Sequence, residues 1–415
     1  MLGRHRRSAR PPSGLCRGNR GHHRLRRCLP RCLRRRPGPG PGVERLPAPG
    51  LGHRCPQGQP PGRPGDHPQA RRSGALHQRE ERSVSKLRVA VIGTGNVAQK
   101  NYLPFLARDA EISLGYYNRT ADKARACADQ FGGLAFDSVA ELMDWAPDTA
   151  LVLTRETQRL EAALALLEHP PRRLFFEKPL VARHGQEQVD EQDFAAGRDI
   201  LRQAAAKGCE TAMIFNYRFF DHSQLAKRVA AERNFGQVRE ITGLVHYACW
   251  SHCIDLIHFF AGPIAQISAL RSETTRTGAR MQVEDVAAAF RTAGDATGTL
   301  IGTAALAWEF PLFELTLNFE RGRIRLQDLD GDLEIMDARG GEVERYGIAR
   351  HRSRWDQYNS SFEKSLAAYL ASIRQNQPPP VPGRFGLLEL QVEAGLKRSI
   401  AQQRPVVLDT EFPLD

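Results

Sequence analysis

The feature that most constrains the fold of this chain is a short apolar run that leads directly into a glycine-rich turn. Residues 87–92 are rich in β-branched side chains, as in a strand buried within a parallel sheet. A helix-like segment to about Arg108 follows the turn, whose residues are Gly93, Thr94, Gly95, Asn96, Val97 and Ala98. The first glycine permits the tight turn, the second lets backbone N–H groups approach a pyrophosphate, and the alanine allows the helix to pack closely on the strand. The sequence therefore predicts a dinucleotide site, with the phosphates at the positive end of the helix.

A second predicted strand, residues 111–117, ends where a dinucleotide site usually recognises the ribose. Asn118, Arg119 and Thr120 follow this strand, and Asn118 lies 25 positions after Gly93. An acidic residue there would bind the ribose 2′-hydroxyl and repel a 2′-phosphate, whereas an amide, a guanidinium and a hydroxyl suit the phosphate. The sequence therefore predicts NADP as the cofactor, with NAD as the alternative. Arg119 can also be a solvated residue at the start of a helix, and the sequence leaves that interpretation open.

Strands and helices alternate over residues 86–215. The predicted helices cover residues 120–130, 138–145 and 157–167, and the further strands lie near Leu134 and at residues 149–154 and 173–176. This alternation indicates an α/β fold with a doubly wound parallel sheet, a Rossmann domain. Ligands bind at the carboxyl ends of the strands in such sheets, so Thr154 and Glu177 join the predicted cofactor site.

Residues 1–85 differ in composition from the rest of the chain. They contain twenty Arg and no Lys, thirteen of the 26 Pro and thirteen of the 36 Gly, and no Phe, Tyr, Trp, Ile or Thr. Such a segment cannot bury enough apolar surface to offset the entropy of ordering it, so we expect it to be disordered. Three interpretations stay open: an arm that binds polyanions, a targeting peptide, and translation outside the natural reading frame with a natural start near Val84.

The charge of the chain is divided in the same way. Residues 1–85 carry twenty Arg against four acidic residues, a net of +16, and because the whole chain carries +12, the remaining residues net −4. The predicted domains therefore give no indication of nucleic-acid binding. The cysteines show no convincing zinc-site spacing, and no apolar stretch reaches the roughly 18 residues that a membrane span requires. We expect a soluble cytoplasmic protein with reduced thiols, no metal, and a small molecule as its partner.

Further motifs stand at several places in the rest of the chain. They are Glu177-Lys178-Pro179 after the strand at residues 173–176, Asn216-Tyr217-Arg218-Phe219, Ser251-His252-Cys253-Ile254-Asp255 and Arg404-Pro405-Val406-Val407-Leu408. With these motifs and the glycine-rich turn, residues 86–409 resemble the Gfo/Idh/MocA family, named for glucose–fructose oxidoreductase and inositol dehydrogenase. The resemblance implies hydride transfer between a nicotinamide and a carbon that bears a hydroxyl or ketone, usually on a sugar or cyclitol. It also implies that residues 216–415 form an α+β domain with an open, mainly antiparallel sheet.

The lysine of the Glu-Lys-Pro motif lies in the active site of this family, so the resemblance assigns a catalytic role to Lys178. As a cation beside the nicotinamide, Lys178 would bind the reacting oxygen and stabilise the charge that develops there. Lys178 and Glu177 are also assigned to the cofactor site, and the family often has the peptide bond before Pro179 in the cis form. The alternative is that Lys178 only forms a surface ion pair with Glu177.

The resemblance makes His252 the second catalytic candidate. Ser251 is expected to cap a helix that begins there, and the positive end of that helix would lower the pKa of a histidine in its first turn. A neutral imidazole is the form that a general base in alcohol oxidation requires. Asp255, three residues further on, either orients the imidazole or is a solvated or inter-domain residue.

Two segments depart from the family pattern. Ala248 stands where the family usually has an aspartate that binds substrate, so substrate binding must differ, and Trp250 nearby either offers a stacking surface for a sugar or belongs to the core. The second departure follows the strand at residues 149–154. The family tends to have a Thr-Pro-Pro-His pattern there, whereas this chain has Arg155 and Arg159. These arginines either contact a ligand or, by default, are exposed to solvent. The substrate contacts that we assign are Tyr217, Arg218, Trp250 and Asp255.

Residues 216–415 are predicted to contain six strands and two closing helices. The strands lie at residues 237–247, 265–271, 282–292, 298–308, 313–319 and 322–327, and the helices at 360–375 and 384–402. Residues 339–359 are polar and are predicted to form a loop over the site. The resemblance places helices on one face of the sheet and a subunit interface on the other, so we expect a homo-oligomer, either a dimer or a tetramer.

The sequence thus favours an NADP-dependent oxidoreductase that acts on CH–OH groups of a sugar-like or cyclitol substrate. Two alternatives stay open. The alanine at position 248 favours a non-catalytic NADP-binding sensor or accessory subunit, and some relatives use the nicotinamide transiently for glycoside hydrolysis. The presence of Lys178 together with His252 favours the oxidoreductase over the sensor, and the sequence leaves glycoside hydrolysis open.

Overall fold

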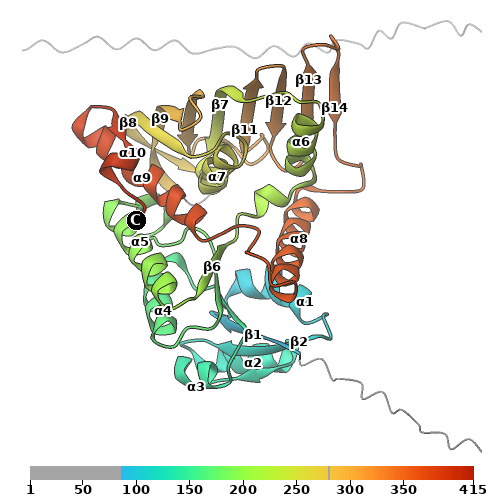
Figure 1. Ribbon diagram of the computed structural model, residues 1–415, viewed down its shortest axis with the longest axis vertical. Helices are drawn as coiled ribbons and strands as arrows, with labels where there is room; N and C mark the ends of the chain where they lie inside the picture. Colours follow the sequence, from blue (N-terminus) through green and yellow to red (C-terminus); the bar gives the residue numbers. More distant parts are fainter. Residues whose placement is uncertain (1–85, 279–280) are drawn as a thin grey trace, which may run out of the picture. The chain divides into compact units, whose positions relative to one another are not determined.

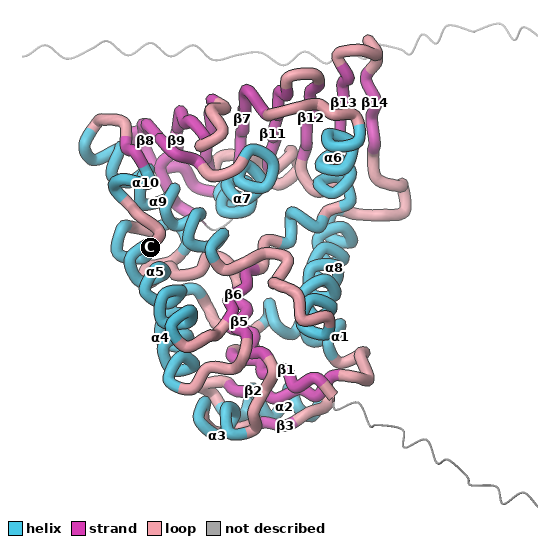
Figure 2. The backbone as a smooth tube through the Cα atoms, in the orientation of Figure 1, coloured by secondary structure: helices cyan, strands magenta, loops and turns pink. Residues whose placement is uncertain are grey.

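The structure, a computed structural model, describes residues 86–278 and 281–415 (Figure 1, Figure 2). The predictions for residues 1–85, including a natural start near Val84, lie outside the described residues. The described residues are built around two sheets, one of six strands and one of nine. None of the helices in this part of the chain is long and apolar enough to cross a membrane.

The six-stranded sheet is entirely parallel and has the strand order β3-β2-β1-β4-β5-β6. Its strands are β1 (Leu87–Ile92), β2 (Ile112–Tyr117), β3 (Leu134–Ala135), β4 (Thr149–Val152), β5 (Arg173–Phe176) and β6 (Glu210–Met213). The order reverses between β1 and β4, which places the switch point of a doubly wound sheet at the glycine-rich turn. The predicted Rossmann fold is confirmed, with β6 as a strand that the sequence analysis did not predict.

Helices cover both faces of this sheet. As a result, alternate residues of β1 belong to two separate cores. Val89 and Val91 pack with the helices α1 and α2, whereas Ala90 and Ile92 pack with α3, α4 and α5. These helices are α1 (Leu103–Leu106), α2 (Ala121–Phe131), α3 (Val139–Asp144), α4 (Glu156–Glu168) and α5 (Glu191–Ala206). The continuous apolar run of β1 is therefore the pattern of a parallel strand that is buried on both faces.

The helix after the glycine-rich turn is shorter and less regular than predicted. It begins as a π-helical turn, η1 (Ala98–Tyr102), and continues as α1, which has Pro104 in its first turn. Proline has no N–H group to donate to the preceding turn, which disfavours regular α-helical hydrogen bonding at this point. The single helix predicted to reach Arg108 is therefore corrected to two short pieces.

The nine-stranded sheet is antiparallel except for the pair β7 and β10, and its order is β14-β13-β12-β11-β7-β10-β9-β8-β15. Its strands are β7 (Val238–His246), β8 (Ile264–Gly278), β9 (Met281–Thr292), β10 (Thr297–Thr303), β11 (Phe313–Phe319), β12 (Gly322–Gln327), β13 (Leu333–Asp337), β14 (Val343–Tyr346) and β15 (Val406–Val407). The predicted open, mainly antiparallel sheet is confirmed. Strand β8 extends beyond its prediction and β10 ends before its prediction, at Thr303.

The remaining helices connect this second sheet to the Rossmann domain. Three of them, α6 (Asp221–Glu232), α7 (Trp250–Ala261) and α9 (Arg384–Gln402), lie on one face of the sheet (Figure 1). Helix α9 also packs on α5, and α8 (Arg354–Arg374) places Phe362 and Leu366 in the core that contains Val89 and Val91. The short elements are η2 (Gln186–Gln188), η3 (Asn216–Phe219), η4 (Tyr247–Cys249) and α10 (Leu408–Glu411). The end of the chain thus returns to stabilise the domain with which the described part begins.

Residues 339–359, predicted to be a loop over the site, contain an edge strand and the start of a helix. Strand β14 pairs with β13, and Arg345 forms an ion pair with Glu334 at 2.8 Å. Helix α8 begins at Arg354, earlier than predicted, because Ser353 and Asp356 form a capping box that satisfies its first amides. A polar strand at the edge of a sheet has no buried apolar face, so the alternation that predicts strands is missing here.

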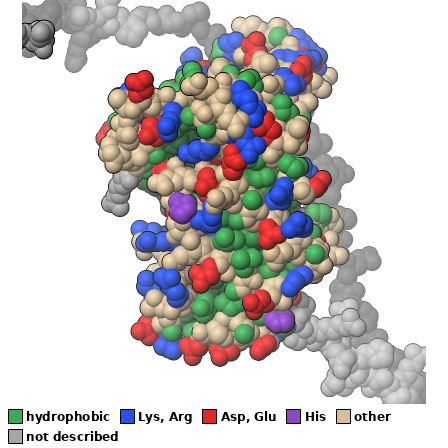
Figure 3. Space-filling view, turned by 90° about the vertical axis from the view of Figure 1, so that its left-hand side faces the viewer, with side chains coloured by type: hydrophobic (Ala, Val, Ile, Leu, Met, Phe, Trp, Pro, Cys, Tyr) green, Lys and Arg blue, Asp and Glu red, His purple; other side chains and the backbone are tan. Residues whose placement is uncertain are grey.

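One face of the molecule shows how the charged side chains are distributed over the surface. On the face in Figure 3, the described Lys and Arg side chains are interspersed with Asp and Glu side chains rather than gathered in one stripe. A continuous basic stripe is the usual electrostatic footprint of a nucleic-acid-binding surface.

Candidate active site

The glycine-rich turn brings the ends of β1 and β4 into close contact. Gly93 has a φ of +93°, and a Cβ atom there would lie 2.7 Å from the backbone nitrogen of Thr154. A Cβ on Gly95 would meet no atom within 4 Å, and Gly95, Asn96 and Val97 are exposed. The turn therefore leaves open space over its second glycine, at the place where a dinucleotide's pyrophosphate would lie. These residues fit the predicted cofactor.

Asn118 connects this turn to the end of β2. Its side-chain oxygen accepts a hydrogen bond from the Thr94 backbone N–H at 3.3 Å, and its amide donates to the Thr120 carbonyl at 3.1 Å. Arg119 and Thr120 are exposed, and the Arg119 guanidinium has no hydrogen-bond or ion-pair partner among residues 86–278 and 281–415. Thr154, across the turn, has a buried hydroxyl without a partner in the same part of the chain. Two of the predicted cofactor residues, Arg119 and Thr154, thus have donor groups that no described residue uses.

Glu177, at the end of β5, is buried and holds the backbone of the next residue. One carboxylate oxygen accepts a hydrogen bond from the Tyr102 hydroxyl at 2.8 Å, and the other accepts from the Lys178 backbone N–H at 2.8 Å. The peptide bond between Lys178 and Pro179 is cis. The Lys178 ammonium donates to the side-chain oxygen of Gln186 at 3.3 Å. The alternative of a surface ion pair between Glu177 and Lys178 is therefore wrong, because the two charged groups have different partners.

Arg159 links the ends of β4 and β5, although the sequence analysis expected it to be exposed. It is buried, and its guanidinium donates to the Thr154 carbonyl at 2.7 Å and to the Pro179 carbonyl. The neighbouring Arg155 is exposed, as expected. The sequence carried a signal for this burial: Arg159 lies one helical turn before Ala163, on the same buried, mainly apolar face of α4.

His252 lies in the first turn of α7 and is almost completely buried. Its ring stacks on Tyr217, with the ring centroids 4.0 Å apart and the planes inclined by 6°. Burial lowers the pKa of His252 well below its usual value, and the positive charge of Lys178 lowers it further. The imidazole is therefore neutral at pH 7, as predicted, but burial rather than the helix end is the main cause. The predicted cap is wrong, because α7 begins at Trp250 and Ser251 lies inside it.

Asp255 pairs with Arg218 and does not orient His252. The two side chains form a bidentate ion pair, with N–O distances of 2.7 and 2.6 Å, and both are buried. Burial raises the pKa of Asp255 to about 6, and Arg218 opposes this shift. The Arg218 guanidinium also lies 4.0 Å from the ring centroid of Phe385. Both expectations for Asp255 are thus corrected, and this pair, assigned to substrate contacts from the sequence, joins η3 to α7.

The other two assigned substrate residues are also largely buried. The Tyr217 hydroxyl lies 3.2 Å from the Cys249 sulfur, and the Tyr217 ring supports His252. Trp250 packs so closely on β10 that a Cβ on Gly302 would lie 2.7 Å from its ring. Of the two interpretations of Trp250, its placement favours a core residue, although one edge of it borders a cavity.

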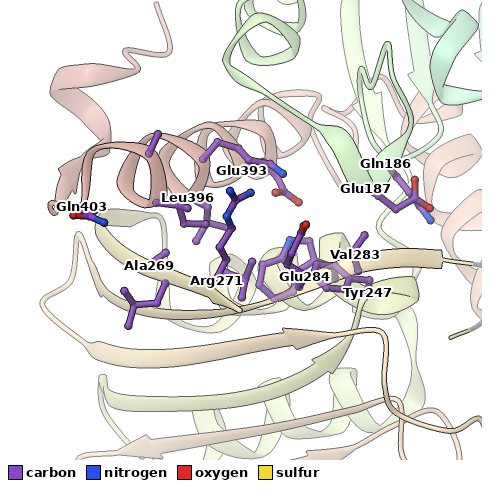
Figure 4. A pocket seen from close by; sticks show the side chains of 16 residues that line it. Gln186, Glu187, Tyr247, Ala269, Arg271, Val283, Glu284, Glu393, Leu396 and Gln403 are labelled. Carbon is purple, nitrogen blue, oxygen red and sulfur yellow. Dashed lines mark hydrogen bonds between the residues drawn. The ribbon is translucent and has the colours of Figure 1, made fainter. Parts of the chain in front are cut away.

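This cavity has a volume of about 490 Å³ and lies between α9 and the strands β8 and β9 (Figure 4). Its wall contains two features that the sequence analysis missed. Gln186, which accepts the hydrogen bond from Lys178, lines it, and so does Glu393, one helical turn after the buried Glu389. Burial raises the pKa of Glu393 to about 7 and also raises that of Glu389, a shift that the Lys178 charge opposes. An acidic pair therefore lies on the buried face of α9, and the Lys178 charge acts on Glu389.

The described residues contain no group of histidine, cysteine and acidic side chains that could hold a metal ion. Their four cysteines, Cys127, Cys209, Cys249 and Cys253, are buried and free. Among the predicted site residues, Lys178 supplies an ammonium group and His252 a neutral imidazole.

Comparisons with known proteins identify the nucleotide-binding part. Residues 87–211 match the model of the GFO_IDH_MocA family, described as an oxidoreductase family with an NAD-binding Rossmann fold. A comparison with curated protein sequences finds no match.

Solved structures extend the likeness to both sheets. An oxidoreductase from Agrobacterium radiobacter in complex with NAD+, L-tartaric acid and magnesium has a TM-score of 0.65 and 16% identity, covering 79% of this chain and 99% of that one. The WlbA dehydrogenase from Bordetella pertussis in complex with NADH and UDP-GlcNAcA has a TM-score of 0.62 and 17% identity, over 78% and 98%. UDP-N-acetylglucosamine 3-dehydrogenase GnnA from Acidithiobacillus ferrooxidans has a TM-score of 0.61 and 16% identity, over 76% and 98%. At these identities the likeness shows a common fold.

The buried ion pair gives a first prediction. Arg218→Ala leaves the Asp255 carboxylate buried without its partner, so the free energy of unfolding should fall by about 3–5 kcal/mol. Urea denaturation measures this change. The control is Arg228→Ala, which removes a surface pair with Glu232 at 3.9 Å and should cost less than about 1 kcal/mol. Equal effects of the two substitutions would contradict the structural role of the Arg218 pair.

A second prediction concerns His258, which is buried on α7 near Arg218. Burial, followed by the Arg218 charge, lowers its pKa from 6.5 to about 3. The unfolded chain therefore takes up a proton below pH 6.5 that the folded chain does not, and stability is lost as the pH falls towards the folded pKa. His258→Gln should reduce the acid slope of the unfolding free energy by about 1.4 kcal/mol per pH unit. The exposed His184→Gln should leave the slope unchanged, and an unchanged slope in His258→Gln would refute the prediction.

Proposed function

Because residues 87–211 match the model of the GFO_IDH_MocA oxidoreductase family, we propose that the protein is an NADP-dependent oxidoreductase. It transfers a hydride between the cofactor and the hydroxyl or ketone carbon of a sugar-like or cyclitol substrate. One observation carries this proposal. The buried Glu177 carboxylate fixes the backbone of Lys178 at the carboxyl edge of the sheet that carries the glycine-rich turn, and the Lys178 ammonium donates to Gln186 rather than to Glu177.

The nicotinamide, when bound, accepts or supplies the hydride. Lys178 binds the oxygen of the reacting carbon and stabilises its partial negative charge, while Gln186 directs the ammonium. His252 accepts the hydroxyl proton during oxidation and returns it during reduction, because its lowered pKa keeps a nitrogen lone pair free at neutral pH. The stacked Tyr217 ring fixes the imidazole plane. Each chemical group thus has a neighbour that orients it.

The cofactor preference rests on the residues that follow β2. Arg119 and Thr120 are exposed beside the turn, and no acidic residue stands at position 118 to repel a 2′-phosphate. The family description names NAD binding, and two of the compared structures contain NAD+ or NADH. We therefore propose NADP for this chain, with NAD as the alternative.

The substrate class and the assembly are part of the same proposal. Two of the compared dehydrogenases are named for, or contain, nucleotide sugars, which supports a sugar-like substrate.

The strand register of the nine-stranded sheet brings four exposed apolar residues into one row: Leu270, Ala287, Ile301 and Leu244. Such an apolar row supports a homo-oligomer, dimer or tetramer, formed through this sheet face. The free thiols of the described residues support a cytoplasmic location.

One other function keeps a specific observation in its favour. Ala248 offers no carboxylate to a substrate, which would suit a non-catalytic NADP-binding sensor or accessory subunit. The retained Lys178 and His252 favour the enzyme, and the two functions differ in a measurable way.

A screen of sugars, nucleotide sugars and cyclitols for a change in nicotinamide absorbance identifies the substrate. With that substrate, Lys178→Ala should lower turnover by at least about 100-fold, because a contact to the developing charge is lost. NADPH binding, measured by fluorescence titration, should persist. Lys123→Ala, an exposed lysine on α2, serves as the control. Wild-type turnover in Lys178→Ala would rule out the proposed role, and a screen without any activity would favour the sensor.

Cofactor titrations test the ribose site separately. The wild type should bind NADPH more tightly than NADH, and Arg119→Ala should reduce that preference by about five- to tenfold, because one charge-assisted contact to the 2′-phosphate is lost. Arg125→Ala, also exposed on α2, should keep the preference. Tighter binding of NADH by the wild type would show that the assignment of residues 118–120 to the 2′-phosphate is wrong.

A further inference from the structure

The cavity between α9 and the strands β8 and β9 has charged side chains on three of its sides. Arg271 comes from β8 and Glu284 from β9, while Glu393 and Lys397 come from α9 (Figure 4). None of these four side chains forms an ion pair with a residue that the structure describes, although most charged side chains near the sheet are paired. Unpaired charges of both signs around a concave site are available to a ligand.

The charges are arranged by depth. The two cations, Arg271 and Lys397, are exposed at the rim and belong to opposite walls. Figure 4 shows the Arg271 guanidinium directed across the cavity towards α9, on the side where Glu393 lies. Glu393 is only 7% exposed, so its carboxylate forms part of the inner wall. A ligand that enters the cavity therefore meets the two cations at the rim and Glu393 in the inner wall.

Two residues that line the cavity are neighbours of the proposed catalytic residues. Gln186 lines the cavity and also accepts the hydrogen bond from the Lys178 ammonium at 3.3 Å. Trp250, another lining residue, lies two positions before His252 on α7. A ligand that contacts Gln186 in the cavity would therefore be separated from the Lys178 ammonium by one hydrogen-bonded side chain.

We infer that this cavity binds the part of the substrate remote from the reacting carbon, and that the substrate is a sugar acid. Its carboxylate binds between Arg271 and Lys397, its hydroxyl groups donate to Glu393 and Glu284, and its reacting carbon faces Lys178. The inference rests on the proposed function only for the identity of the reacting end.

The chemistry of the wall determines both the ligand class and its orientation. A guanidinium binds a carboxylate through two parallel donors, and a second cation on the opposite wall increases the attraction. Carboxyl groups accept hydrogen bonds from hydroxyl groups and offer no positive charge to an anion, so the acidic end of the ligand is expected at the two cations rather than at the inner wall. The volume of about 490 Å³ lies within the range of roughly 300–1,000 Å³ that small-molecule sites occupy.

Calorimetric titration tests this inference on the full chain, with and without NADPH. The probes are D-glucuronate, D-galacturonate and D-gluconate, each compared with its neutral counterpart, glucose, galactose or sorbitol. At least one acid should bind about tenfold more tightly than its neutral counterpart. Arg271→Ala should abolish this preference, whereas Arg291→Ala, an exposed arginine of β9 outside the cavity, should retain it. Glu393→Gln should weaken the acid and its neutral counterpart by similar factors, because it contacts hydroxyl groups.

The inference is overturned if none of the three acids binds below about 10 mM, or if Arg271→Ala and Arg291→Ala behave alike. NADPH titration of the same samples separates this failure from a failure of the proposed function. Cofactor binding and activity on a neutral sugar, without binding of the acids, would leave the oxidoreductase proposal intact. Acid binding that depends on Arg271 in a protein without affinity for either nicotinamide cofactor would support the cavity and reject the proposed reaction.

Discussion

The buried carboxylate of Glu177 is the contact on which the arrangement of the site depends. Its two oxygens are occupied by the Tyr102 hydroxyl and the Lys178 backbone N–H, both at 2.8 Å. Tyr102 belongs to the helical turn after the glycine-rich loop, so this carboxylate connects the cofactor turn to the segment that carries Lys178. Arg159 adds a parallel link between the ends of β4 and β5. With its backbone fixed in this way, Lys178 directs its ammonium away from Glu177 and towards Gln186.

The second half of the site comes from another sheet, so its position depends on contacts between distant parts of the chain. The His252 ring stacks on the Tyr217 ring, and the helix that carries His252 is fixed to η3 by the Arg218–Asp255 pair. Helices α8 and α9 then return to the Rossmann domain, where α8 completes one core and α9 packs on α5. These contacts fix the position of His252 relative to the Rossmann domain, although 74 positions separate it from Lys178 in the sequence.

Local patterns were enough to predict most of the fold and the placement of several site residues. The buried run of β1, the glycine spacing and the alternation of strands and helices each reflect short-range constraints, and the structure agrees with them. The prediction failed where polar residues had a structural purpose that only distant partners reveal. The interpretation that Asp255 orients His252, one of those left open, is wrong because Asp255 pairs with Arg218, which lies 37 positions earlier. Glu393 was missed because the cavity wall exists only in the folded chain. Arg159 is the exception, since its spacing on the apolar face of α4 was already visible in the sequence.

The central claim is that Lys178 and His252 together face the nicotinamide of a dinucleotide bound at the glycine-rich turn. A crystal structure of the protein with NADPH tests it most directly. The account predicts the pyrophosphate over Gly95, the 2′-phosphate at Arg119, and the reactive nicotinamide carbon within about 3–5 Å of the space between the Lys178 ammonium and the His252 ring. A nicotinamide ring bound away from these two residues, or a cofactor bound elsewhere on the chain, would contradict it.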